Sequence, residues 1–172
     1  MEKVFKPEFD GKGIWMYWPD DNARMFKENV EKGFMACGLP NPDIDLGDLN
    51  QIGVRRIKAT VDAEYGKPNP AAVKLMTDIY HRVDIGDFVI ARNGFDAIVG
   101  IGIVTSDYYY DEEQPLFNHC RKVEWINTDT WTFPEELKRD GKWHRVTLID
   151  QHYRYIAEEL ITAICEGKSE EE

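Results

Sequence analysis

Three runs between residues 86 and 125 decide the fold: GDFVIARNG (86–94), AIVGIGIV (97–104) and HCRKVEW (119–125). Each run is rich in β-branched or aromatic residues and has the length of a strand. Asn93-Gly94 ends the first run, and this dipeptide accepts the backbone angles of a tight hairpin. We therefore predict three strands, of which the first two are joined by a hairpin at Asn93-Gly94.

The alternation of side chains along a strand assigns faces in the third run. Val123 and Trp125 are its apolar members, and His119 and Arg121 share their face. A charged or polar group on a buried face needs a partner or a ligand. His119 and Arg121 therefore either bind a phosphate or a base edge, or belong to a buried network. The candidate partners in such a network are Asp87, Asp107 and Asp111.

Two glycines mark the second run. Gly100 and Gly102 lie two residues apart and project from the same face of their strand. The missing side chains let a neighbouring backbone or a flat ligand approach closely.

The rest of the sequence predicts three more strands and several helices. A strand is expected at 13–18, ended by Pro19. Asn69-Pro70 is a capping residue followed by proline at the first helical position, and Thr132 with Glu135 forms a possible capping box. The other expected elements are a helix to 31, a strand at 33–38, helices at 54–65, 70–83 and 132–141, a strand at 143–149 and a helix after Asp150. The order favours an α+β fold with a bent, barrel-like sheet.

Length and composition describe one folded domain. The chain has 172 residues, and we expect a domain at 1–165 followed by an acidic tail or the start of a linker at 166–172. It shows neither a signal-peptide pattern nor an apolar run long enough to span a bilayer. Three scattered cysteines are too few for a disulfide framework or a zinc site. We therefore expect a cytoplasmic protein.

The net charge and the absence of several motifs argue against several classes of function. The net charge of −11 argues against a general polyanion binder, although a small basic patch remains compatible with it. Asp43, Asp45 and Asp48 lack the spacing and the closing glutamate of a calcium loop. The sequence has neither a nucleophile elbow nor a Gly-rich phosphate loop, and its four histidines lack metal-ligand spacing. We predict a non-enzymatic chain without catalytic residues, metal or cofactor.

Aromatic residues make up 12% of the chain, and several of them cluster beside turns. Consecutive aromatics on a strand cannot all enter one core, because alternate side chains leave by opposite faces. Some of them therefore either line a pocket for a flat base, held by stacking, or lie scattered on the surface. The candidate aromatic residues are Trp15, Trp18, Tyr108, Tyr110 and Phe117.

The central stretch resembles a known module. GDFVIA (86–91), IVGIGIV (98–104), DYYYD (107–111) and HCRKVEW (119–125), together with LGDL (46–49) after 33–38, look like the EVE/PUA-like domain. The similarity is to the form fused to McrB-type GTP-dependent restriction motors, and it covers about residues 13–125. Leu39 departs from it, because related modules often carry Trp there, and the acidic charge is unusual for a DNA-binding domain.

The resemblance implies a PUA/EVE/YTH-like bent β-barrel sheet flanked by helices and a reader function. The module would hold a flipped modified base in an aromatic cage and would be the specificity domain of a type IV, McrBC-like restriction system. Its partners would be methylated double-stranded DNA, an AAA+ GTPase motor and a McrC-like nuclease. Val123-Glu124-Trp125-Ile126 looks like a strand of YTH domains, which favours N6-methyladenine over 5-methylcytosine. A reader of modified RNA and a protein-interaction domain are the alternatives.

The resemblance also implies roles for individual residues. Trp15 or Trp18 would form one cage wall, and Tyr108, Tyr110 or Phe117 another. Asp20 or Asn22 would bond the base edge. The residues expected at the nucleic-acid backbone are Arg92, Asn93, His119 and Arg121.

Overall fold

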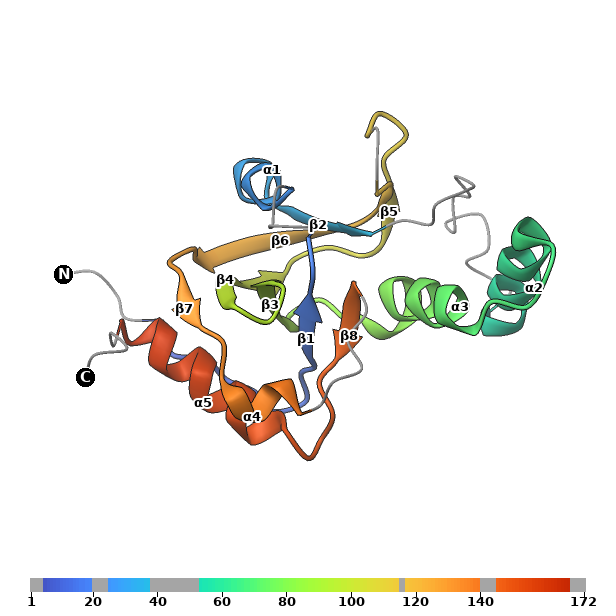
Figure 1. Ribbon diagram of the computed structural model, residues 1–172. Coiled ribbons are helices and arrows are strands. Elements are labelled where there is room, and N and C mark those ends of the chain that lie inside the picture. The colour runs from blue at the N-terminus through green and yellow to red at the C-terminus, as the bar shows by residue number, and fades with distance from the viewer. Residues whose placement is uncertain (1–4, 20–24, 38–52, 115–116, 140–144, 168–172) are drawn as a thin grey trace.

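The computed structural model describes residues 5–19, 25–37, 53–114, 117–139 and 145–167. The strands are β1 (Ile14–Tyr17), β2 (Phe34–Cys37), β3 (Phe88–Asn93), β4 (Ala97–Val104), β5 (Tyr109–Tyr110), β6 (His119–Asn127), β7 (Trp131–Thr132) and β8 (Val146–Leu148). The helices are α1 (Phe26–Lys32), α2 (Gly53–Tyr65), α3 (Pro70–Thr77) with its π-helical continuation η3 (Asp78–Arg82), α4 (Glu135–Lys138) and α5 (Arg154–Cys165). Strands and helices are mixed along the chain, with α2 and α3 in succession before an unbroken series of strands from β3 to β7 (Figure 1).

The described strands form one mixed sheet. Its order is β2-β6-β4-β3-β1-β8, with β5 paired to β6 and β7 paired to β4. The central pair β3–β4 is an antiparallel hairpin, and β4 pairs antiparallel with β6. β1 lies parallel to β3. The three runs that the sequence singles out are therefore neighbours at the centre of the sheet, as predicted.

The sheet curls so that distant strands meet. β1 and β2 are separated by three strands in the order of the sheet. Nevertheless the backbone N–H of Ala36 in β2 donates to the hydroxyl of Tyr17 in β1 at 3.1 Å, and that hydroxyl donates to Asn29 Oδ1 at 3.0 Å. A flat sheet would hold these strands well apart, since neighbouring strands are spaced about 4.8 Å. The α+β class with a bent, barrel-like sheet is confirmed.

Helices cover both faces of the curled sheet. Along β1, Trp15 and Tyr17 point to a core that includes residues of α1, α2 and α3. Ile14 and Met16 point to a second core that is closed by α4 and α5. Because both faces are buried, every residue of β1 is apolar and buried, which explains its unbroken run of large side chains.

Side chains fill the space above the two strand glycines. A Cβ atom at Gly100 would lie 2.4 Å from Cζ of Phe26, and one at Gly102 would lie 2.4 Å from Cγ1 of Val123. The close approach predicted at these positions is therefore made by side chains of the core. Gly100 admits the ring that fastens α1 to the sheet.

Two local predictions need correction. The β3–β4 hairpin has a three-residue loop, since Asn93 pairs with Ala97, and only Gly94 in it takes a positive φ, 56°. The capping box of Thr132 and Glu135 is absent: α4 begins after Pro134 without a side-chain cap. By contrast, Asn69 does cap α3, accepting from the N–H of Ala72 at 3.2 Å, with proline in the first turn.

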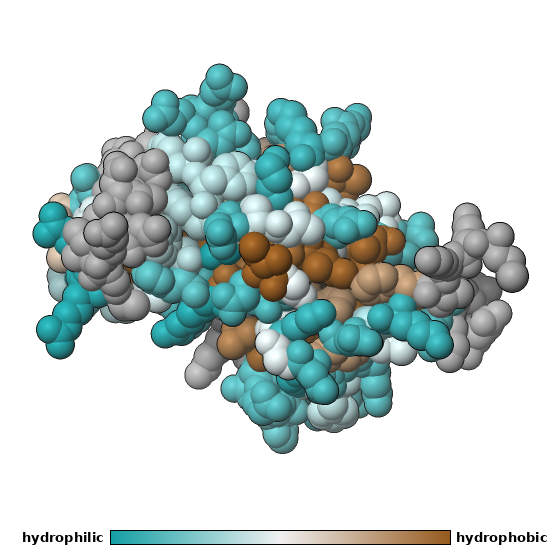
Figure 2. All heavy atoms as spheres, turned by 180° about the vertical axis from the view of Figure 1, so that it is seen from behind, coloured by the Kyte–Doolittle hydropathy of each residue, from teal (hydrophilic) through white to brown (hydrophobic). Residues whose placement is uncertain are grey.

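Hydrophobic residues also reach the surface. Figure 2 shows a hydrophobic band across the middle of the rear face, bordered by hydrophilic residues. The exposed large apolar side chains come from separate parts of the chain: Phe5, Ile85, Phe95, Leu148 and Tyr155. Single exposed apolar residues are normal and indicate no binding site by themselves. Within the described ranges, none of the helices is long and apolar enough to cross a membrane.

Candidate nucleic-acid interface

Two candidate aromatic residues meet at the end of β1. Trp18 follows β1, and its backbone N–H donates to the carbonyl oxygen of Arg145 at 2.8 Å, because β8 runs antiparallel beside β1. Phe117 precedes β6, far away in the sequence. The Cζ atom of Arg145 lies 4.9 Å from the ring centroid of Trp18 and 4.1 Å from that of Phe117. One guanidinium thus lies over both rings, and all three side chains are half-buried.

The curl of the sheet brings this group together. Trp18 directly follows β1 and Arg145 directly precedes β8, toward one end of the strand order, whereas Phe117 leads into β6 near the other end. The thiol of Cys37, the last residue of β2, is buried, and burial raises its pKa although the charge of Arg145 opposes the shift. Arg145 therefore lies near the ends of both edge strands. We call Trp18, Phe117 and Arg145 the aromatic group.

A second guanidinium lies beside Trp18. The Cζ atom of Arg92 is 5.7 Å from the ring centroid of Trp18 and 5.1 Å from that of Phe95. Its Nη1 donates to the carbonyl oxygen of Gly94 at 2.9 Å, so the side chain folds back along its own hairpin. Arg92 is buried, and burial lowers its pKa to about 10, which leaves it charged at neutral pH. Asn93 is half-buried at the tip of the same hairpin.

The other candidate tyrosines belong to a separate cluster around His119. The hydroxyl of Tyr108 and Nδ1 of His119 share a hydrogen bond of 2.8 Å, and the two rings stack with centroids 5.8 Å apart. Tyr110 contacts the imidazole edge-to-face, at 5.4 Å. Tyr108 also packs against Tyr80 of η3. His119 is therefore buried within a ring cluster, and its hydrogen-bond partner there is Tyr108, which was not among the expected carboxylate partners.

A small polar cavity adjoins the His119 cluster. It has a volume of about 360 Å³, and its lining includes Tyr80, Tyr108 and Arg121 together with two acidic residues, Asp84 and Asp107. The carboxylates make it unfavourable for a phosphate, since like charges repel. This cavity therefore suits a polar or cationic group better than a nucleic-acid backbone.

Arg121 is occupied by the fold. Its Nε donates to the carbonyl oxygen of Ile79 at 2.9 Å, Nη2 to that of Tyr80 at 2.7 Å, and Nη1 to that of Ser106 at 3.2 Å. The side chain is 3% exposed, and burial lowers its pKa. Arg121 ties η3 to β6, and its N–H groups donate to backbone carbonyl oxygens although the side chain also lines the polar cavity. These contacts give no support to its predicted role at the nucleic-acid backbone, which stays a prediction.

Trp15 also belongs to the core. It is 1% exposed, and its indole N–H donates to Oδ2 of Asp87 at 2.9 Å. Asp87 in turn accepts the backbone N–H groups of Gly13 and Asp84. Both faces of β1 are buried and Trp15 lies within that strand, whereas Trp18 follows its last residue and is half-buried. Of the two tryptophans proposed as a cage wall, the structure offers only Trp18 to a ligand.

Several predicted residues lie outside the described ranges. Asp20 and Asn22, which were proposed to bond the base edge, are among them. The others are Leu39 and the acidic loop with Asp43, Asp45 and Asp48. Among the residues that the structure does describe, no cluster of three or more His, Cys, Asp or Glu side chains is arranged to hold a metal.

Arg145 is the residue that the sequence analysis missed. It lies in the segment KWHRVTLI (142–149), which reads as the start of a strand. The only sequence signal is that an arginine stands at the third position of the strand predicted at 143–149. Its contact with Trp18 and Phe117 depends on strand order, which one sequence does not reveal.

Comparison with protein families identifies the chain. The sequence model of a family described as "Domain of unknown function (DUF8426)" matches residues 15–151. The chain belongs to this family. No curated protein matches this DUF8426 member.

Solved structures with a similar fold are YTH domains. The YTH domain of Zygosaccharomyces rouxii MRB1, in complex with N6-methyladenosine RNA, has a TM-score of 0.53 and 12% identity, and the match covers 92% of each chain. The Pho92 YTH domain in complex with m6A has a TM-score of 0.52 and 12% identity over 93% of this chain and 92% of that one. An Mmi1 YTH domain has a TM-score of 0.52 and 11% identity over 91% and 100%. The DUF8426 chain therefore has a YTH-like fold.

Proposed function

We propose that this domain is a non-enzymatic reader that binds an unpaired N6-methyladenine against Trp18 and Phe117. The observation that carries the proposal is the aromatic group itself: two half-buried rings from different strands meet over one cation at the end of the sheet. Flat rings of this kind bind a base by stacking. Two solved neighbours of the same fold are described as complexes with N6-methyladenosine RNA or m6A, which supports this choice of base.

The energies fit a reader that selects a methyl group modestly. Stacking of a base on an aromatic side chain contributes about 1–3 kcal/mol, and burial of one methyl group adds about 0.8 kcal/mol. Extruding a base from a duplex costs a few kcal/mol, which an unpaired base avoids. A methyl preference far above tenfold therefore needs a contribution from the base edge as well.

We place methylated single-stranded RNA first among the polymers, because RNA is what the solved neighbours carry. Methylated double-stranded DNA is the second candidate, and it rests on the resemblance of residues 86–125 to the module of McrB-type restriction proteins. In that case the domain would supply specificity to an AAA+ GTPase motor and a McrC-like nuclease. If the ligand is duplex DNA, 5-methylcytosine is an alternative to N6-methyladenine as the modified base.

A fluorescence-anisotropy titration at one stated low salt concentration tests the proposal. The ligands are single-stranded RNA with and without N6-methyladenine, and one DNA duplex unmodified, with N6-methyladenine, and with 5-methylcytosine. We expect the methylated RNA to bind most tightly. Preference for a methylated duplex would indicate that the ligand is DNA. Equal binding of all five nucleic acids would refute the reader function.

Two variants locate the site. Trp18→Ala and Phe117→Ala should each weaken binding of the methylated strand by about tenfold or more, since each removes one stacking surface. The matched control is Tyr155→Ala on α5, which also removes a ring but one that is 57% exposed and outside the aromatic group. If Tyr155→Ala has as large an effect as the other two variants, the base does not bind at the aromatic group.

A further inference from the structure

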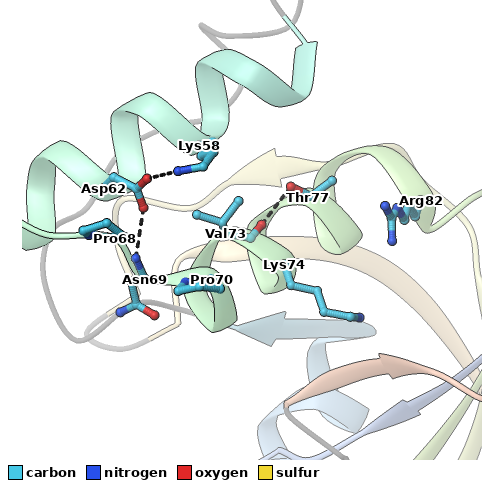
Figure 3. A pocket seen from close by; sticks show the side chains of 9 residues that line it. All are labelled: Lys58, Asp62, Pro68, Asn69, Pro70, Val73, Lys74, Thr77 and Arg82. Carbon is cyan, nitrogen blue, oxygen red and sulfur yellow. Dashed lines mark hydrogen bonds and ion pairs between the residues drawn. The ribbon is translucent and has the colours of Figure 1, made fainter.

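A second pocket lies between α2 and α3, and its lining includes no residue of the aromatic group. It has a volume of about 420 Å³ and combines an apolar wall with cations. Figure 3 shows Val73 of α3 pointing toward α2, with Pro68 and Pro70 beside it. The rest of the lining is polar or charged: Lys58, Asp62, Asn69, Lys74, Thr77 and Arg82. This volume lies within the range of small-ligand sites.

One hydrogen bond between α2 and the capping residue of α3 helps to preform the pocket. Asp62 of α2 accepts the backbone N–H of Asn69 at 3.0 Å and also pairs with Lys58 (Figure 3). Asn69 in turn caps α3. The segment that joins α2 to α3 is therefore held at both ends, and a ligand would not have to order it.

The far end of the pocket carries more positive than negative charge. Lys74 Nζ lies 2.8 Å from Oδ2 of Asp78, and Arg82 Nη1 lies 3.3 Å from its Oδ1. Asp78 is 1% exposed, whereas about half or more of each cationic side chain is exposed. One buried carboxylate thus holds two cations side by side, and both retain N–H donors for an anion. Such an excess stands out in a chain of net charge −11.

We propose that this pocket holds a second nucleotide of the strand whose methylated base binds at the aromatic group, an inference that rests on the proposed function. The base would lie against Val73 and the prolines, and a phosphate would accept hydrogen bonds from Lys74 and Arg82. An anion next to a flat apolar group is the chemistry of a nucleotide, and it complements both halves of the pocket. A strand that reaches this pocket gains affinity that does not depend on methylation.

The first test places a carboxylate in the pocket. Val73→Asp should weaken binding of a 12-nucleotide methylated RNA by about tenfold at low salt, through repulsion of the phosphate. Ala71→Asp is the matched control, because it makes the same kind of change in the first half of the same helix at an exposed residue outside the pocket. Equal effects of the two substitutions would overturn the inference.

The second test removes charge without removing polar side chains. The double variant Lys74→Gln/Arg82→Gln should weaken binding of the 12-nucleotide RNA and lower its salt dependence by about 0.7 in slope for each phosphate that the variant no longer neutralises. Lys32→Gln is its control, since Lys32 is an exposed lysine in an i,i+4 pair on α1. If the double variant binds the 12-nucleotide RNA as tightly as the parent protein does, the inference is also overturned.

The ratio of methylated to unmethylated affinity separates this inference from the proposed function. In the pocket variants the ratio should equal that of the parent protein, because the pocket binds both RNAs through the same unmethylated nucleotide. A ratio of one in every protein, combined with weaker binding by the pocket variants, would refute the reader function and support the pocket. If the pocket variants instead weaken only the binding of an acidic peptide that contains aromatic residues, the occupant is a protein segment and the inference fails.

Discussion

The guanidinium of Arg145 lies over the ring of Phe117, with its Cζ 4.1 Å from the ring centroid. The same Cζ lies 4.9 Å from the centroid of Trp18. Arg145 therefore covers ring faces that a base would use. Its guanidinium is flat and stacks on rings as a base does, and a cation over an aromatic ring contributes about 0.5–2 kcal/mol.

The first prediction is that Arg145→Ala strengthens binding of the methylated RNA by several-fold. The base would no longer have to displace a cation from the two rings. Acrylamide quenching of tryptophan fluorescence should increase as well, because Trp18 loses a neighbour. Arg154→Ala on α5 is the control, since that arginine bonds Phe9 and Glu158 instead. Weaker binding by Arg145→Ala would mean that the guanidinium takes part in holding the base.

The second prediction concerns Gly100. An alanine there would place Cβ 2.4 Å from Cζ of Phe26, far inside van der Waals contact. Phe26 also contacts Trp125 edge-to-face at 4.9 Å, so its ring has little room to move. We expect Gly100→Ala to lower the free energy of unfolding by about 1–3 kcal/mol, as overpacking does, measured by urea denaturation.

A double variant isolates the cause of that loss. Phe26→Leu shortens the side chain above Gly100 and should itself destabilise the fold. Gly100→Ala/Phe26→Leu should then cost less than the sum of the two single substitutions, because the clash is absent. A stabilising effect of Gly100→Ala, as expected from the lower backbone freedom of alanine in a strand, would show that the ring yields without cost.

The third prediction separates structure from binding at Arg121. Arg121→Met keeps an unbranched apolar stem but removes the guanidinium, and so leaves three backbone carbonyl oxygens without their donor. Each unsatisfied buried acceptor costs about 1–3 kcal/mol, so we expect a loss of stability of at least about 3 kcal/mol. The salt dependence of RNA binding by the folded fraction should not change. A lower salt slope for Arg121→Met than for the parent protein would indicate that Arg121 contacts the nucleic-acid backbone.

Regular patterns in the sequence were sufficient to predict the centre of the fold. The alternation in 119–125 correctly puts Arg121 and Val123 on the buried face, because strand geometry leaves no other arrangement. Asn69 before Pro70 correctly predicts the start of α3, since capping depends on neighbouring residues only. Predictions of this kind rest on local geometry, which the sequence contains in full.

Contacts between distant segments could not be predicted from the sequence. Tyr108 and Phe117 both qualified as cage walls, but the fold pairs Tyr108 with His119 and brings Phe117 to Arg145. Trp15 and Trp18 likewise differ only in whether strand pairing covers them. These assignments depend on the curl of the sheet, which brings β1 into contact with β2 although three strands separate them in its order.

The last prediction is a loss of stability at alkaline pH that depends on the buried thiols. Burial, helped by the charge of Asp111, raises the pKa of Cys120 to about 12 from an ordinary value of 9.0, and burial also raises that of Cys37. In the unfolded chain both thiols ionise near pH 9. Above that pH the unfolded state loses protons that the folded state keeps, so unfolding becomes more favourable.

The contribution of the two thiols is therefore fully present below about pH 9 and is lost as the pH rises toward 12. We expect the urea midpoint of the parent protein to fall more steeply between pH 8 and pH 11 than that of Cys37→Ala/Cys120→Ala. Cys165→Ala is the control, because that thiol is only half-buried and its removal should change the slope less. Parallel slopes in the parent and the double variant would show that other groups cause the alkaline loss.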